Sequence, residues 1–152
     1  MIHKIVSEAG GFMTVKKRWE HFTHDADIGV RGIGPTLADA FEMGALALTH
    51  VITDSHLIKP DSIFHVVCQA PDIEILFVDW LNTVIYYMDI HNMLFCEFQV
   101  TIKNHGLEAI IKGEVVDRER HHPAVEVKGA TYTELNVFYD HDVWTAQCIV
   151  DV

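Results

Sequence analysis

Two segments of the chain repeat apolar residues at helical spacing. The first follows Gly34-Pro35-Thr36, where the Thr36 hydroxyl is placed to accept the backbone N–H of Asp39 and so to start a helix. The second opens at Pro71-Asp72 and runs to about Asp89. The apolar stripes are Leu37, Phe41, Leu48 and Val51 or Ile52 in the first segment, and Ile73, Phe77, Trp80 or Leu81, Val84 and Met88 in the second. These patterns predict two amphipathic helices.

Alternating and β-branched runs predict strands in most of the remaining chain. The expected strands are Lys17–His24, Ile28–Ile33, Ile63–Gln69, Leu94–Ile102, Leu107–Val116, Glu126–Val137 and Trp144–Val150, with a loop at Asp25–Gly29 and a charged turn at Asp117–His122. Two helices packed on a largely antiparallel β-sheet make a single α+β domain. Residues 1–16 show no clean period, so we expect a ragged N-terminal extension there and the domain at 17–152.

The composition adds a strong acidic imbalance. Eleven Lys and Arg side chains against 22 Asp and Glu give a formal net charge of −11, and 49% of the residues are hydrophobic. Such a chain has no broad cationic face to neutralise a phosphate backbone, so direct, tight nucleic-acid binding is not expected. The charge either suits a basic protein partner, such as an enzyme whose groove is built for nucleic acid, or serves only solubility.

The cysteines and the apolar runs indicate a cytoplasmic protein. Cys68, Cys96 and Cys148 are odd in number, far apart and outside any C-x-x-C pair, which favours reduced thiols. The N-terminus lacks the apolar core of a secretory signal, and the longest apolar stretch, 73–88, contains two carboxylates. Neither export nor a membrane span is predicted.

Carboxylates gather near the two ends of the chain. Asp25 and Asp27 lie two residues apart, so in an extended segment their side chains would share a face. Asp151 and the carboxylate of Val152 close the sequence. Together these oxygens are the ligands that Ca²⁺ or Mg²⁺ takes, provided that strand Trp144–Val150 lies beside strand Lys17–His24. The alternative is that one aspartate only caps its own turn.

Other kinds of site find less support in the sequence. His21 and His24 would lie on opposite faces of a strand, and no nearby Cys or His pair completes a tetrahedral zinc set. There is no G-x-S-x-G elbow, P-loop or paired G-x-G-x-x-G motif, so a self-contained enzyme is not indicated. Lys128, in a strand-like run, is either an ordinary exposed lysine or a group that faces phosphate or carboxylate.

An ordered set of short stretches, from about Trp19 to the last residue, resembles the archease family. The stretches are His24-Asp25-Ala26-Asp27-Ile28-Gly29, Thr36-Leu37-Ala38-Asp39-Ala40-Phe41, Asp79-Trp80-Leu81-Asn82, Glu126-Val127-Lys128-Gly129-Ala130-Thr131-Tyr132 and Asp151-Val152. The resemblance implies a small α+β protein that is not an enzyme. It implies an activator of the RtcB-type RNA ligase in tRNA splicing and RNA repair, which promotes guanylylation of the ligase by GTP and its multiple turnover.

The resemblance also implies roles for particular residues. It assigns metal binding to Asp27, Asp151 and Val152, with Ca²⁺ as the expected cation and Mg²⁺ or Mn²⁺ as alternatives, and it assigns activation of the ligase to Lys128. Two positions depart from the family pattern. Asp25 stands where the family usually has Thr, so it either joins the metal site or caps the loop, and Thr133 stands where many members have His.

Two other functions remain open at this point. One is a chaperone-like or modulatory binding module for tRNA-modifying proteins, such as an RNA methyltransferase, that works without metal. The other is a metal-dependent hydrolase that uses the same carboxylates, although the sequence shows no nucleophile or general-base pair for it.

Overall fold

The computed structural model describes residues 2–6 and 12–152, with side chains from Lys16 onward. Its principal helices are α1, Leu37–Ile52, and α2, Ile73–His91; a short helix α3, Arg118–His121, and a 3-10 turn η1, Ser55–Leu57, lie in connections. The strands are β1 Ile2–Val6, β2 Phe12–Lys16, β3 Arg18–His24, β4 Asp27–Gly34, β5 Ser62–Gln69, β6 Met93–Lys103, β7 Gly106–Val115, β8 Gly129–Ala130, β9 Asn136–Asp140 and β10 Val143–Asp151.

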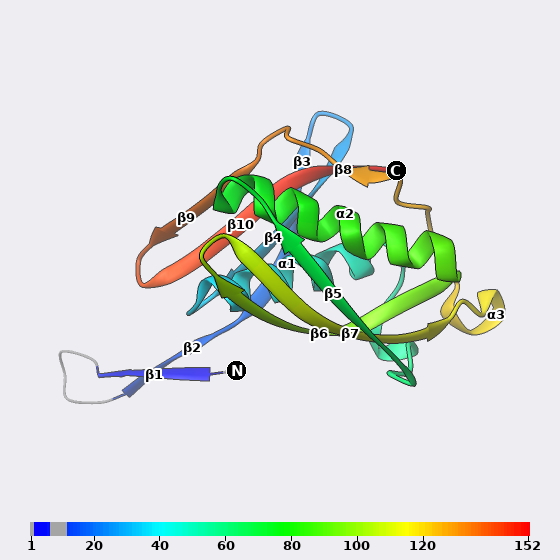
Figure 1. The fold of residues 1–152 in the computed structure, drawn as a ribbon, viewed down its shortest axis with the longest axis horizontal. Helices are drawn as coiled ribbons and strands as arrows, with labels where there is room; N and C mark the ends of the chain where they lie inside the picture. Colours follow the sequence, from blue (N-terminus) through cyan, green and yellow to red (C-terminus); the bar gives the residue numbers. More distant parts are fainter. Residues whose placement is uncertain (1, 7–11) are drawn as a thin grey trace.

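The strands form three antiparallel sheets in the described part of the chain. β1 pairs with β2, a five-stranded sheet has the order β3-β4-β10-β8 with β9 also on β10, and a three-stranded sheet has the order β5-β7-β6. Helix α1 contacts β4 and β10 on one side and β6 on the other, and α2 likewise contacts strands of both larger sheets. The helices therefore lie between the two larger sheets (Figure 1). The predicted α+β class, with two main helices and antiparallel strands, is confirmed.

Both main helices begin where their capping residues predict. The Thr36 hydroxyl accepts the Asp39 N–H at 3.1 Å, and the Asp39 carboxylate accepts the Thr36 N–H at 3.3 Å, which completes a capping box. Asp72 caps α2 by accepting the Ile75 N–H at 2.8 Å. The second helix continues to His91, slightly beyond the predicted end, and stops at Asn92 in the left-handed conformation.

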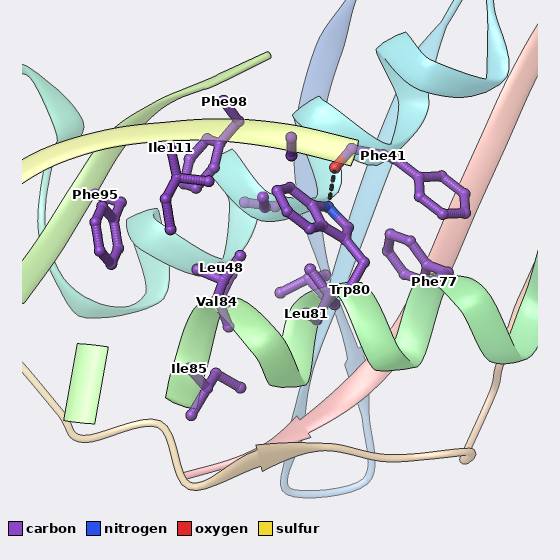
Figure 2. Packing of buried hydrophobic residues seen from close by; sticks show 14 of the residues in the cluster. Phe41, Leu48, Phe77, Trp80, Leu81, Val84, Ile85, Phe95, Phe98 and Ile111 are labelled. Atoms are coloured by element: carbon purple, nitrogen blue, oxygen red, sulfur yellow. Dashed lines mark hydrogen bonds between the residues drawn. The ribbon is translucent and has the colours of Figure 1, made fainter. Parts of the chain in front are cut away.

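One continuous core joins the helices to both larger sheets. Trp80 is fully buried and donates its indole N–H to the Phe41 carbonyl at 2.9 Å, and the Phe41 and Phe77 rings meet edge to face at 5.1 Å (Figure 2). The same buried cluster includes Val30 of β4 and Ile111 of β7. No helix in the described residues is long and apolar enough to cross a membrane.

The strand predicted over Glu126–Val137 is wrong. Only β8 and the first residues of β9 fall in it, because the outer edge of β10 is shared: β9 pairs with Val143–Gln147 and β8 with Val150 and Asp151. Between β8 and β9 the chain loops out, and Glu134 adopts a φ of 55°. The turn predicted at Asp117–His122 contains one helical turn, α3, which Asp117 caps.

Part of segment 1–16, for which the sequence pattern predicted no regular element, forms the strands β1 and β2. Residues 1 and 7–11 of that segment lie outside the described residues.

Gly32 fixes how closely β4 approaches α1. A Cβ at this position would meet the Ala40 carbonyl oxygen and the Gly44 nitrogen, both backbone atoms of α1. We expect Gly32→Ala to lower the free energy of unfolding by about 1–3 kcal/mol, as overpacking typically does. Urea unfolding measures this, with Gly129→Ala as the control, because a Cβ there makes only an ordinary contact at 3.6 Å. Equal stability of the two variants would contradict the close approach.

Candidate metal and partner site

The pairing of β4 with β10 brings the aspartate-containing turn near the start of the domain next to the last residues of the chain. The pairing runs from Gly34 with Trp144 to Ile28 with Val150, and Asp27 and Asp151 are the next residues along the two strands. The sequence argument required β10 to lie beside β3; instead β10 pairs with β4, and β3 lies on the other side of β4. Asp27 and Asp151 therefore face each other across neighbouring strands.

Both carboxylates lie on the solvent side of the sheet. Val30, Cys148 and Val150 belong to the core between the sheets, and side chains alternate along a strand, so Asp27 and Asp151 point away from the helices. Both residues are exposed. Like charges directly opposite each other on an antiparallel pair are destabilising, and a cation or a cationic partner would relieve that repulsion.

Lys128 lies at the same end of the sheet. Its backbone N–H donates to the Asp151 carbonyl at 2.8 Å, and Gly129 pairs with Asp151 as the first residue of β8. The Lys128 side chain is exposed and makes no ion pair within the described part of the chain. Asp27, Asp151, Val152 and Lys128 thus share one end of the five-stranded sheet, where the C-terminus lies near the turn from β3 to β4 (Figure 1). We call these four residues the acidic edge.

Two residues without a predicted role hold Lys128 in place. The Asn82 amide on α2 binds both backbone groups of Ala130, accepting its N–H at 2.9 Å and donating to its carbonyl at 3.2 Å. The Thr131 hydroxyl donates to the Ile149 carbonyl at 2.9 Å. An amide between buried residues of an amphipathic helix is a sequence signal for such a clamp, since buried polar groups are normally hydrogen-bonded.

The turn before Asp27 is tighter than predicted. Asp25 and Ala26 form a two-residue turn, with His24 and Asp27 already paired across it, and Asp25 has a φ of 55°. The extended geometry assumed for Asp25 and Asp27 is therefore wrong, because alternation of side chains does not continue through a left-handed residue. Asp25 is exposed at the tip of the turn.

The nearby histidines contact different elements. His21 Nε2 lies 2.8 Å from the Ala47 carbonyl of α1, whereas His24 Nε2 lies 3.5 Å from a Glu134 carboxylate oxygen. Across the described residues, no three His, Cys, Asp or Glu side chains come close enough to hold a metal ion. Asp27 and Asp151 fit a hard cation by donor chemistry, but Ca²⁺ takes six to eight oxygens, so two carboxylates alone do not complete its ligand set.

A partly buried clip of three side chains fixes the start of the connection that leads to Lys128. Arg120 donates to both oxygens of Glu114, at 2.6 and 2.8 Å, and His121, fully buried, lies 2.9 Å from Glu114 Oε2. Because His121 Nδ1 accepts the Asp117 N–H, its Nε2 carries the proton and donates to Glu114. The Arg120 guanidinium lowers the pKa of Glu114 to about 2, and hydrogen bonds from the Lys59 backbone N–H and from His121 act in the same direction.

The depressed pKa predicts a pH-dependent contribution to stability. Glu114 has a folded pKa of about 2 against its usual 4.5, so its ionised form stabilises the fold above 4.5, and this contribution falls as the pH drops towards 2. At neutral pH we expect Glu114→Gln to cost about 1.5–3 kcal/mol in the free energy of unfolding, the size typical of charged hydrogen bonds.

Denaturant unfolding of the wild type and of Glu114→Gln across this pH range measures the difference, with the exposed neighbour variant Glu119→Gln as the control. The loss caused by Glu114→Gln should shrink in acid, while the control should stay close to the wild type at every pH. A loss that is independent of pH would contradict the role of the clip.

Comparisons with known proteins agree on one family. Residues 19–152 match the model of the Archease protein family (MTH1598/TM1083). The protein archease of Pyrococcus abyssi is 37% identical over 141 residues, which cover 90% of this chain and 99% of the Pyrococcus protein. The protein archease of Methanosarcina acetivorans is 33% identical over 141 residues, which cover 90% of this chain and 97% of the Methanosarcina protein. The solution structure of Methanobacterium thermoautotrophicum protein 1598 superposes with a TM-score of 0.72 at 27% identity, covering 88% of this chain and 98% of that one. The Thermotoga maritima archease, described as a possible chaperone, shares the fold with a TM-score of 0.57 at 18% identity, covering 86% and 94%.

Proposed function

Because the chain belongs to the archease family, we propose that it is a non-enzymatic activator of an RtcB-type RNA ligase in tRNA splicing and RNA repair. In this proposal it promotes guanylylation of the ligase by GTP, and thereby multiple turnover. It works in the cytoplasm, and the domain at 17–152 carries the activity, with 1–16 as an extension.

The observation that carries the proposal is the position of Asp27 opposite Asp151 at the exposed end of β4 and β10. Two solvent-facing carboxylates in register form a concentrated negative charge on a chain of net charge −11. Such a surface complements a basic groove and speeds encounter with it. The acidic edge would enter the metal- and nucleotide-binding region of the ligase.

The chemistry of the edge follows from its oxygen atoms. Asp27, Asp151 and the Val152 carboxylate would hold a divalent cation, Ca²⁺ in our proposal and Mg²⁺ or Mn²⁺ as alternatives. When bound, the cation supplies positive charge that stabilises phosphate oxygens. The aspartates would orient this charge relative to GTP as the ligase histidine attacks. Asp25, at the tip of the same turn, would add negative charge beside them.

Lys128 gives the acidic edge a single cation of its own. Its backbone N–H donates to the Asp151 carbonyl, which holds Lys128 at the same end of the sheet as the two carboxylates. We propose that Lys128 contacts a phosphate or carboxylate in the complex with the ligase. This contact needs a fixed strand position, which the Asn82 clamp on Ala130 supplies.

Single-turnover guanylylation of the matching ligase, with GTP and divalent metal, tests the proposal. We expect the wild-type chain to accelerate the reaction, and Asp27→Asn, Asp151→Asn and Lys128→Ala to lose about tenfold or more of that acceleration, since ~1.4 kcal/mol of lost stabilisation is a factor of ten in rate. Asp89→Asn is the control for the aspartates, because it removes an equal charge from an exposed position on α2.

Thermal unfolding of each variant establishes that it is folded before its activity is compared. Full stimulation by all three edge variants would contradict the role of the acidic edge. No stimulation by the wild-type chain would contradict activation itself and favour a chaperone-like module, which recovery of an RNA methyltransferase without the ligase in a pull-down would then support.

A further inference from the structure

One charged side chain in the middle of α2 has no role in the fold or in the acidic edge. Trp80 and Leu81 are fully buried in the core, and the Asn82 amide holds Ala130. The carboxylate of Asp79, the residue before them, is partly buried, yet it makes no hydrogen bond or ion pair within the described residues. A partly buried charge without a partner is costly, so a cation from outside the chain would gain from meeting it.

Asp79 lines a hollow of about 360 Å³ between α2 and β5. The lining contains no Lys, Arg or His, so the Asp79 carboxylate is its only charged group and gives the hollow a negative potential. The α2 wall is a stripe of residues three and four apart, and the β5 wall is the end of the strand. The lining residues are Asp79, Asn82, Thr83 and Tyr86 on α2 and Val67, Cys68 and Gln69 on β5.

Two exposed apolar groups stand at the same hollow as the carboxylate. Tyr86 is 58% exposed and Val67 is 65% exposed. The aliphatic stem of a long basic side chain lies readily on such surface while its charged head meets a polar group. The face of a tyrosine ring also attracts a cation, most often that of arginine. The hollow therefore combines a carboxylate with an aromatic ring and an aliphatic wall.

The chain shows on its own surface what such a combination holds. The Arg31 guanidinium lies over the Phe22 ring, 4.4 Å from its centroid, and donates to a Glu20 carboxylate oxygen at 3.0 Å. There a ring and a carboxylate together fix one arginine. At the hollow, Asp79 and Tyr86 offer the same two groups, and no described residue supplies the cation.

We propose that the hollow binds the guanidinium group of an arginine side chain presented by a protein partner. Asp79 accepts the guanidinium N–H groups, and the Tyr86 ring stacks on the guanidinium plane. Arginine suits this site better than lysine, because its planar fork pairs with a carboxylate through two hydrogen bonds and stacks on an aromatic face. The inference rests on the proposed function, which makes the RNA ligase the partner, since grooves that bind nucleic acid are rich in basic side chains.

Asn82 makes the hollow continuous with the acidic edge. Its side chain lines the hollow and also holds Ala130, two residues after Lys128. Two residues of extended chain span at most about 7 Å. A partner that contacts Lys128 therefore lies close enough to place an arginine in the hollow, and the two contacts belong to one interface.

An NMR titration with Nα-acetyl-arginine amide tests the site without the ligase. We expect the backbone amide signals of Asp79, Asn82 and Tyr86 to shift, and the neutral citrulline analogue to leave them in place. Asp79→Asn should weaken the affinity about tenfold or more, the size expected for a lost charged hydrogen bond. Asp89→Asn is the matched control, because Asp89 is exposed on the same helix and outside the hollow.

Four results of the titration would overturn the proposal. These are equal shifts with citrulline, stronger binding of the lysine derivative, unchanged affinity in Asp79→Asn, and an equal loss in Asp89→Asn. The first would exclude a charged ligand and the second a guanidinium site, while the last two would place the binding elsewhere.

The affinity of the complex with the ligase, measured by isothermal titration, tests the partner. Asp79→Asn and Tyr86→Ser, each shown to be folded by thermal unfolding, should weaken the complex about tenfold, and Asp89→Asn should not. Unchanged affinity in both hollow variants would overturn this inference, while stimulation by the wild-type chain would leave the proposed function intact. A wild-type chain that neither binds nor stimulates the ligase would contradict the proposed function and its ligase as the partner; binding of the arginine derivative that depends on Asp79 would still support the guanidinium site.

Discussion

The antiparallel register between β4 and β10 is the constraint on which the acidic edge depends. Val30, Cys148 and Val150 are buried between the sheets, and Gly32 lies against the backbone of α1, so the two strands cannot slip. A shift of one residue would turn every side chain of a strand to the opposite face. The core thus holds Asp27 opposite Asp151 although the two carboxylates repel each other, and a cation or cationic partner would gain from relieving that repulsion.

The third strand at this edge is held by a short ladder together with side chains. β8 pairs through only two residues, Gly129 and Ala130; backbone hydrogen bonds on either side of it and contacts from the Asn82 amide and the Thr131 hydroxyl add to the pairing. Upstream, the clip of Glu114 with Arg120 and His121 fixes the connection from β7. Lys128 therefore combines an exposed, adaptable side chain with a backbone tied to Asp151, which suits a group proposed to meet a partner.

Local signals predicted local structure well, and long-range pairing poorly. Thr36 and Asp72 start their helices as expected, because a cap depends only on its neighbours in sequence. That β10 pairs with β4 rather than β3 could not be read from strand periodicity, which carries no information on partners. The alternation over Glu126–Val137 was misleading for the same reason, since β10 offers its free edge to β9 and β8 in turn. The resemblance located Asp27, Asp151 and Lys128, and the structure shows them at one edge.

The most direct test of the central claim is a double-mutant cycle on Ca²⁺ affinity, measured by isothermal titration of the wild type, Asp27→Asn, Asp151→Asn and the double variant. If the two carboxylates hold one cation together, each single change should weaken binding almost as much as both changes combined. Independent, additive losses, or Ca²⁺ affinity that neither substitution alters, would contradict the account of a shared site at the end of β4 and β10.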